Sequence, residues 1–237
     1  MDVMPAPGTA PLGELRWPEV ADGPRRLLVV PLGSLEQHGP HLPMDTDTRI
    51  AMAVAARACA GRPGVGLAPP VAFGASGEHA GFPGTLSIGT EALAFLLVEL
   101  GRHASADWPA MLVVNGHGGN AAAITDAARR LAAEGQACHS WHAGLPGHRL
   151  ADPHAGRFET SLLLALAPGL VRLDLAAPGD VRPLAEIMPE LRARGVRAVS
   201  PSGVLGDPAG ASADEGEILL GQLVARLDHT LDMILAD

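Results

Sequence analysis

Short runs of consecutive apolar residues alternate along the chain with longer segments whose apolar residues recur at helical spacing. These β-like runs predict strands at 27–32, 65–72, 111–114 and 136–141, and the first of them is continuously apolar. Pro69 and Pro70 indicate that the second strand lies at an edge or ends early, because proline cannot donate a hydrogen bond to a neighbouring strand.

The segments of helical spacing predict helices at 47–60, 90–105, 120–134, 159–167, 183–194 and 213–236. Thr90 is the expected N-cap of the second helix, and Gly135 is the residue that closes the third. Strands that alternate with helices indicate a mostly parallel sheet with helices on both faces. The fold class predicted from this pattern is α/β.

The chain shows no internal repeat and no clear linker, so residues 14–237 are expected to form a single domain. Residues 1–13 are rich in proline, alanine and glycine and are expected to be a flexible N-terminal leader. They have neither a basic start nor an apolar core, so they do not resemble a signal peptide.

Composition narrows the range of partners and locations. The 237 residues carry a formal net charge of −9, without a run of Lys and Arg, and only 3% are aromatic. We therefore expect no nucleic-acid partner, since such proteins present basic stripes and stacking side chains. The apolar stretch 161–167 is too short to cross a bilayer, so no membrane partner is expected. Cys59 and Cys138 lack a CxxC pattern, which favours reduced thiols and a cytoplasmic location.

The loop that follows the first predicted strand, 33–47, concentrates residues that bind metals. It contains Glu36, His38 and Asp47, together with a second histidine and a second aspartate. Imidazole and carboxylate groups are ligands for divalent metals, and the glycine and proline residues of the loop allow the irregular backbone on which ligands converge. The loop therefore predicts a metal site.

Later segments carry the same kinds of side chain, each after a predicted strand. These side chains are Glu78, His117, His154 and Glu159. The glycine-rich turn around His117 fits neither of the common phosphate-binding patterns. Because ligands of open parallel sheets bind at the carboxyl ends of the strands, the segments are expected to meet at one rim of the sheet and to share one site.

Several nearby residues leave alternatives open. His41 can be a metal ligand or a hydrogen-bond donor behind the ligands. Asp45 is a better candidate for the N-cap of the following helix than for a ligand. The histidines of a later run can form a second metal-binding tract or, as we favour, a polar loop at the mouth of the substrate site; they are His139, His142 and His148.

Together these segments resemble the creatininase family of metal-dependent amidohydrolases. The resemblance rests on the motifs EQHGPHLP at 36–43, TD at 46–47, SGEH at 76–79, FPGT at 82–85, NGHGGN at 115–120 and HAGRFETS at 154–161. It implies a three-layer αβα fold with a mostly parallel sheet, two divalent metal ions per subunit (Zn, Fe or Mn) and a homo-oligomer.

The resemblance also implies a set of metal ligands. Glu36 and His117 would hold one metal. His38 would hold the second metal, and Asp47 would bridge the two.

Position 119 departs from the pattern of creatininase itself. There the second metal also takes a glutamate two residues after the histidine of the glycine-rich turn, where this chain has Gly119. Glu159 is the expected substitute as a metal ligand. The difference argues against creatinine as the substrate.

Within the family, the metal-binding loop and the tail 198–208 resemble peptidases that act on a modified ribosomal precursor peptide. By that resemblance the chain would hydrolyse an amide bond near the C-terminus of such a peptide and release its Val-Tyr-derived unit. We expect His154 to protonate the leaving amine or to stabilise the oxyanion, and Ser76 and Glu78 to orient the substrate or a ligand histidine. The alternatives are an amidohydrolase that acts on a small cyclic amide or a formamide, and a non-catalytic metal- or peptide-binding protein.

Overall fold

The computed structural model describes residues 10–145 and 152–236 of the chain. Most of the expected leader, 1–13, lies outside the described residues, so its boundary with the domain stays a prediction. The first described elements are a 3-10 turn at Leu12–Glu14 and the short helix α1 at Trp17–Ala21.

Parallel strands form a 4-stranded sheet in the order β2-β1-β3-β4. The strands are β1 at Leu27–Leu32, β2 at Val65–Leu67, β3 at Ala110–Asn115 and β4 at Ala137–His142. Leu32 pairs with Asn115, and Asn115 pairs with His142, so the carboxyl ends of β1, β3 and β4 are level with one another. The loops that leave these strands therefore start at the same edge of the sheet.

The second strand is shorter than its prediction of 65–72. β2 ends at Leu67, before Pro69 and Pro70, and Val71 returns to β1 through an isolated bridge. The prolines account for the early end because they lack the amide hydrogens that a strand ladder needs. β2 is an edge strand of the sheet, as its prolines indicated.

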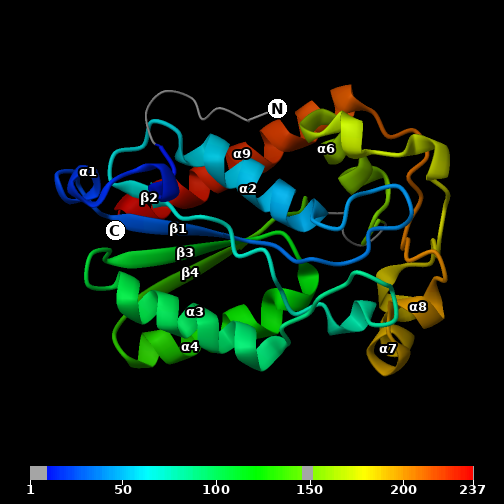
Figure 1. Ribbon diagram of the computed structural model, residues 1–237, viewed down its shortest axis with the longest axis horizontal. Coiled ribbons are helices and arrows are strands. Elements are labelled where there is room, and N and C mark those ends of the chain that lie inside the picture. The colour runs from blue at the N-terminus through cyan, green and yellow to red at the C-terminus, as the bar shows by residue number, and fades with distance from the viewer. Residues whose placement is uncertain (1–9, 146–151, 237) are drawn as a thin grey trace.

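Helices cover both faces of the sheet (Figure 1). One face carries α2 at Thr46–Cys59, α6 at Arg157–Leu166 and α9 at Ala213–Ala236. The other face carries α3 at Thr90–Ala104 and α4 at Ala121–Ala133. The sheet is therefore the middle of three layers.

The alternation of side chains along β1 builds the two cores. Leu27 and Val29 belong to the core under α2, α6 and α9, whereas Leu28 and Val30 belong to the core under α3 and α4. Successive side chains of a strand point to opposite faces, so a continuously apolar strand requires apolar cover on both sides. The predicted α/β class and the three-layer αβα arrangement are confirmed.

Helix boundaries agree closely with the predictions, but two caps differ. The predicted N-cap of α3 is Thr90, whereas Gly89 holds that position and Thr90 is the first helical residue. Gly89 has φ 78°, a left-handed conformation that glycine adopts without steric cost. Asp45 is the N-cap residue of α2, but its carboxylate accepts a hydrogen bond from Arg49 at 2.7 Å instead of capping the helix. Gly135, with φ 78°, follows α4 as expected.

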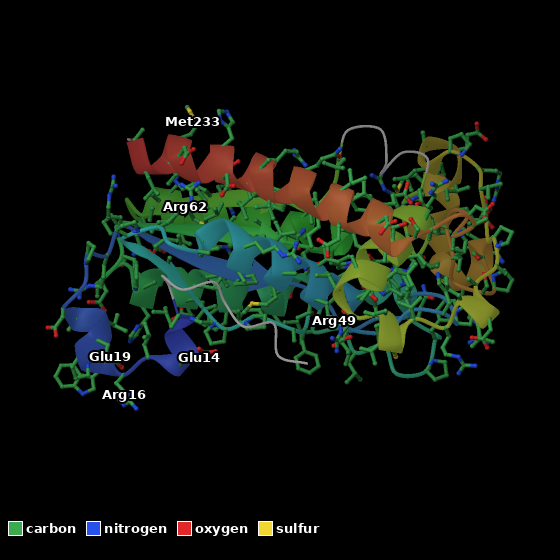
Figure 2. All side chains as sticks on the ribbon, turned by 90° about the horizontal axis from the view of Figure 1, so that it is seen from above. Glu14, Arg16, Glu19, Arg49, Arg62 and Met233 are labelled. Carbon is green, nitrogen blue, oxygen red and sulfur yellow. The ribbon has the colours of Figure 1, made fainter. Side chains whose placement is uncertain are left out.

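The long helix α9 lies along α2 and α6 (Figure 2). Its buried stripe, which includes Leu220 and Leu227, is part of the core. Arg62, just after α2, donates to Asp228 at 3.1 Å and to Asp232 at 2.5 Å on α9. Within the described part of the chain, none of the helices combines the length and the apolar character that a bilayer crossing requires.

The segment after α6 lies beyond the carboxyl ends of the strands (Figure 1). It forms 3-10 turns at Pro168–Leu170 and Leu173–Leu175 and then the helices α7 at Leu184–Arg194 and α8 at Val196–Val199. A small core joins α7 and α8 to the loop before α9; its buried members are Ile187, Val196 and Leu205. These helices thus stand next to the loops that carry the predicted site.

The substitution Leu97→Ala tests the core under α3 and α4. The side chain of Leu97 is fully buried, whereas Leu100 on the same helix is 40% exposed. We expect Leu97→Ala to lower the free energy of unfolding by about 2–5 kcal/mol, because it removes buried methyl groups and leaves a cavity. In urea denaturation, the matched control Leu100→Ala is expected to cost less than half as much. Equal losses for the two variants would contradict the packing described for α3.

Candidate metal centre

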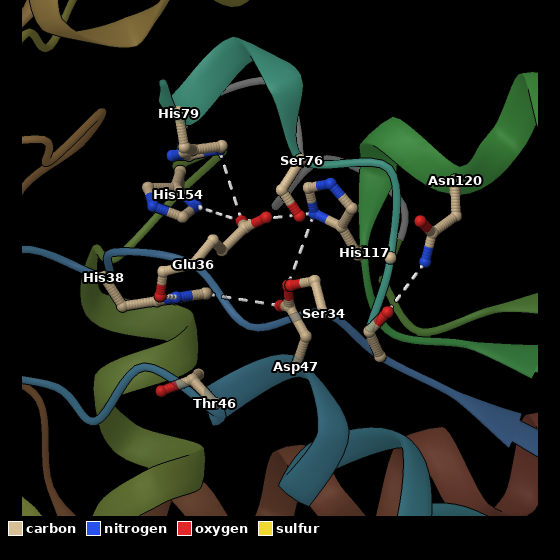
Figure 3. Close-up of polar contacts among 12 residues, drawn as sticks. Ser34, Glu36, His38, Thr46, Asp47, Ser76, His79, His117, Asn120 and His154 are labelled. Carbon is tan, nitrogen blue, oxygen red and sulfur yellow. Dashed lines mark hydrogen bonds and ion pairs between the residues drawn. The ribbon is translucent and has the colours of Figure 1, made fainter. Parts of the chain in front are cut away.

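The predicted metal ligands meet beyond the carboxyl ends of the strands (Figure 3). They come from the loop after β1, the first turn of α2, the turn after β3 and the first turn of α6. These ligands are Glu36, His38, Asp47, His117 and Glu159. The first four are buried, with at most 5% of each residue exposed, and Glu159 is partly buried. The structure brings together all the side chains that the sequence named as ligands.

Close packing holds Asp47 under the loop that follows β1. The hydroxyl of Ser34 donates to Oδ2 of Asp47 at 2.6 Å. Gly33 allows this approach, because a Cβ at that position would lie 2.2 Å from Oγ1 of Thr48. Asp47 also lies in the first turn of α2, where the helix dipole favours a negative charge.

Two asparagines hold the glycine-rich turn against the other segments. Nδ2 of Asn120 donates to the backbone oxygen of Gly33 at 2.9 Å, and its Oδ1 accepts from the backbone N–H of Ala75 at 2.8 Å. Nδ2 of Asn115 donates to the backbone oxygen of His117 at 2.6 Å. The turn that carries His117 is therefore tied to the loops after β1 and β2.

Glu36, Asp47 and His117 form one group of potential ligands. Nδ1 of His117 lies 3.2 Å from Oε1 of Glu36 and 3.3 Å from Oδ2 of Asp47. The other ring nitrogen, Nε2, lies 3.3 Å from two acceptors, the backbone oxygen of Ala75 and Oε1 of Glu78. In the neutral ring Nε2 therefore carries the hydrogen, and Nδ1 presents its lone pair to the carboxylates.

His38 faces the other oxygen of Asp47. Nε2 of His38 lies 3.3 Å from Oδ1 of Asp47 and 3.8 Å from Oε2 of Glu159. Nδ1 of the same ring donates to the backbone oxygen of Glu36 at 3.2 Å, which leaves the lone pair of the neutral ring on Nε2. The two oxygens of Asp47 thus face one histidine each, as a carboxylate that bridges two metals requires.

Glu36 is the clearest indication that the site holds a cation. Its side chain is fully buried. Oε2 has no hydrogen-bond partner among the described residues, and Oε1 lies 3.2 Å from Nε2 of His79 and 3.2 Å from Nδ1 of His117. A buried carboxylate with so few donors is costly unless a cation lies beside it. The residues present therefore fit a divalent metal, and their nitrogen and oxygen atoms are ligand types for zinc, manganese and iron.

The carboxylates also shift the pKa values of the ligand histidines. Burial disfavours the charged form of His38, but the carboxylates of Asp47, Glu159 and Glu36 together outweigh burial and raise its pKa to about 10. Burial is likewise outweighed at His117, where Glu36 and Asp47 raise the pKa well above its usual range. A positive charge, whether a proton or a metal ion, is therefore stabilised next to each of these rings.

The other predicted residues surround the ligands. Ser76 is buried, and its hydroxyl lies beside Glu36 and His117 without a hydrogen-bond partner among the described residues (Figure 3). Glu78 faces the outer nitrogen of His117. Burial alone would raise the pKa of Glu78, but its interaction with His117 lowers it. Nδ1 of His154 lies 3.8 Å from Oε1 of Glu36. The roles expected for these three residues stay predictions.

Gly119 has no room for a side chain. A Cβ at this position would lie 2.3 Å from Oε1 of Glu78 and 2.4 Å from Nε2 of His117. Glu78 therefore occupies the space in which a longer side chain at 119 would begin. Oε2 of Glu159 lies 3.8 Å from Nε2 of His38, which supports Glu159 as the substitute ligand.

A cleft of about 540 Å³ opens onto the site. Its lining includes the predicted site residues Asp47, Glu78, His117, His154 and Glu159. Apolar side chains, several of them from α7 and α8, form much of the remaining wall; they are Phe158, Leu184, Met188, Leu191, Val196 and Leu205. The site is thus open to a substrate that carries an apolar group next to the reacting bond.

Sequence reasoning assigned no role to several buried side chains that shape the site. Each of these side chains is hydrogen-bonded to a ligand, to another member of the set or to a segment that carries a ligand. They are Ser34, Gln37, His79 and Asn120. Their only signal was position, because each stands close to a predicted site residue in the sequence. Their partners lie in other segments, and the sequence does not reveal them.

Three of the four histidines whose roles the sequence left open lie within the described residues. His41 is buried, and its Nε2 lies 3.0 Å from Oγ1 of Thr160, outside the groups of potential ligands found among the described residues. His139 and His142 lie in β4, so the prediction of a polar loop is wrong for both. His139 falls inside the strand predicted at 136–141, and His142 is the one residue by which the strand extends past that prediction. His148 lies outside the described residues.

A three-layer αβα domain with buried carboxylates and histidines at the rim of its parallel sheet is an arrangement that suits a metal-dependent hydrolase. The family model described as "Creatininase: Creatinine amidohydrolase" matches residues 13–231. The chain therefore belongs to the creatininase family.

Relatives of the chain include peptidases and structurally known creatininases. The mycofactocin precursor peptide peptidase of Mycolicibacterium smegmatis is 53% identical over 205 residues, which cover 84% of this chain and 81% of that protein. The structure named "Creatininase Mn" is 26% identical, with a TM-score of 0.76, and the match covers 97% of this chain and 100% of the other. A mutant creatininase of "Zn-Zn type" has the same identity of 26% and TM-score of 0.76, with coverage of 97% and 99%.

The substitution Glu36→Gln tests the metal site. It keeps the shape of the side chain but removes the negative charge that faces His117. We expect the variant to bind divalent metal at least about 10-fold more weakly, measured as metal content after dialysis. Glu91→Gln, on the exposed surface of α3, is the matched control and is expected to retain its metal. An undiminished metal content in Glu36→Gln would rule out Glu36 as a ligand.

The substitution Gly119→Ala tests the close packing around His117. The added methyl group must displace His117 or Glu78, so we expect a loss of about 1–3 kcal/mol in the free energy of unfolding and weaker metal binding. Gly77→Ala is the control, because a Cβ at Gly77 would meet nothing within 4 Å. If thermal unfolding and metal content are the same in both variants, the packing described for Gly119 is incorrect.

Proposed function

We propose that the chain is a two-metal peptidase of mycofactocin biosynthesis. It hydrolyses an amide bond near the C-terminus of a modified ribosomal precursor peptide and releases the Val-Tyr-derived unit. The proposal rests on two sets of potential ligands beside a cleft with apolar walls. One set contains His117 and the other His38, and Asp47 lies between these two histidines. The 53% identity to the peptidase of Mycolicibacterium smegmatis supports the choice of substrate.

Each metal has its own histidine in this proposal. Glu36 and His117 would hold one ion. His38 and Glu159 would hold the other, with Asp47 between the two groups of ligands. Zinc, iron or manganese suits these ligands, and the creatininase structures of Zn-Zn and Mn type support zinc and manganese.

Bound divalent metals lower the pKa of water toward about 7 and polarise a carbonyl group. The hydroxyl group of water adds to the amide carbon, the C–N bond breaks, and the leaving amine takes up a proton. His154 delivers that proton through Nδ1. Burial lowers the pKa of His154 below its usual range, which keeps the ring neutral and able to accept a proton from water.

Two polar side chains assist in this scheme. The hydroxyl of Ser76, which has no partner among the described residues, binds the peptide close to Glu36. Glu78 orients His117 through the outer ring nitrogen, as partners behind a metal ligand commonly do.

A second candidate is a creatininase-type amidohydrolase that acts on a small cyclic amide or a formamide. The family description as creatinine amidohydrolase favours it. Gly119 argues against creatinine, because the position cannot carry the glutamate that creatininase uses.

Mass spectrometry of the products separates the two candidates. We expect the metal-loaded chain to convert the modified precursor peptide into two fragments whose summed mass exceeds that of the peptide by one water. Creatinine is expected to remain intact. A chelator should abolish the reaction, and added zinc or manganese should restore it. Turnover of creatinine, without turnover of the peptide, would overturn the proposal in favour of the second candidate.

The variant His154→Gln tests the proton transfer in the same assay. We expect kcat to fall by about 10²–10⁴-fold while the metal content stays unchanged, because a general acid–base residue has been removed without loss of a ligand. Loss of metal from this variant would instead identify His154 as a ligand.

A cytoplasmic location and a homo-oligomer complete the proposal. Cys59 and Cys138 are free thiols, and burial raises the pKa of Cys59 to about 12, which disfavours the reactive thiolate. Phe95 on α3 is 59% exposed, and large apolar side chains of this kind favour association with another copy.

A further inference from the structure

We propose that Gln37 orients two histidines of the site so that His79 presents an N–H group and His154 presents a lone pair. His79 is then a hydrogen-bond donor of the site and not a metal ligand. The alternative is coordination, because Glu36, His79 and His154 also lie close enough together to hold an ion. The inference rests on the metal centre of the proposed function but is independent of its peptide substrate.

The carboxamide of Gln37 can be oriented in only one way. Its Oε1 accepts from the backbone N–H of Gly39 at 2.9 Å, and its Nε2 donates to the backbone oxygen of Gly203 at 3.1 Å. Exchange of the two atoms would place donor against donor and acceptor against acceptor. Gly203 allows the close approach, because a Cβ there would lie 1.8 Å from Oε1 of Gln37. The side chain is buried, so water does not compete for these groups.

The two hydrogens on Nε2 of Gln37 have three nearby atoms to meet. These are Nδ1 of His79 at 2.9 Å, Nε2 of His154 at 3.0 Å and the backbone oxygen of Gly203. Nε2 of His154 also lies 2.9 Å from the backbone oxygen of Gln37, which can only accept, so this nitrogen carries a hydrogen and donates it there. The amide hydrogens therefore go to Gly203 and to Nδ1 of His79. Any other assignment leaves a buried acceptor unpaired.

His79 and His154 consequently turn different groups toward the ligands. The hydrogen of His79 is on Nε2, which lies 3.2 Å from Oε1 of Glu36. The lone pair of His154 is on Nδ1, 3.8 Å from the same oxygen. A metal ligand needs a lone pair directed at the ion, which His38 and His117 provide and His79 does not.

Because His79 also lines the cleft, its N–H can meet Glu36 or an oxygen of the substrate. His79 thus adds a hydrogen-bond donor on the side of the site where Glu36 otherwise has none.

Nitrogen-15 NMR of the histidine side chains in the zinc-loaded full-length chain tests this assignment. We expect His79 to carry a hydrogen on Nε2 and to show no zinc-bound nitrogen, with the signal assigned by its loss in His79→Gln. His79→Gln is expected to retain its full zinc content, whereas His117→Gln, the matched control, loses zinc. A zinc-bound Nε2 in His79, or a loss of zinc from His79→Gln equal to that from His117→Gln, would overturn the proposal.

The variant Gln37→Met tests the positioning role of Gln37 itself. It keeps the length of the side chain but removes the donor that faces Nδ1 of His79. We expect the His79 signal to change from a single Nε2–H form to a mixture of tautomers, with peptide turnover reduced about 10–100-fold and zinc content unchanged. A single Nε2–H form that persists in Gln37→Met would show that Gln37 does not set the hydrogen. Zinc content and tautomer need no substrate, so failure on the peptide alone would count against the proposed function only.

Discussion

The carboxylates of Glu36 and Asp47, buried at the rim of the sheet, place two negative charges where water cannot stabilise them. Two buried carboxylates this close together are stable only when a positive charge lies beside them, and neighbouring side chains provide positions for that charge. Nδ1 of His117 and Nε2 of His38 both turn their lone pairs toward these oxygens. The level ends of β1 and β3 make this convergence possible, because each strand delivers its loop to the same edge.

Most of the fold could be predicted because the central strands β1 and β3 are nearly continuous apolar runs. A strand such as β1, with every residue buried, requires helices on both faces and therefore implies three layers. The N-cap of α3 could not be predicted, since the choice of Gly89 over Thr90 depends on a left-handed backbone conformation that no apolar pattern encodes. The end of β2 at Leu67 could not be predicted to the residue, although Pro69 and Pro70 indicated that the strand could end early.

The candidate ligands could be predicted because histidine and carboxylate residues rarely gather after successive strands without a shared site. The contacts that position these ligands could not be predicted from the sequence. Glu78 fills the space beside Gly119, and Gln37 bridges segments that are far apart in the sequence. Such contacts depend on distances between individual atoms, and hydrogen positions on His79 follow from those distances rather than from residue type.

The ligands are spread along the chain from Glu36 to Glu159, so no short stretch of unfolded polypeptide can present them together. A metal that binds only the folded state stabilises it by mass action, and without metal the carboxylates of the rim repel one another. In the proposed two-metal centre, folding and metal supply are therefore linked. In a metal-starved cell, a larger fraction of the chain would unfold and be degraded, so that metal availability would set the amount of protein as well as its activity.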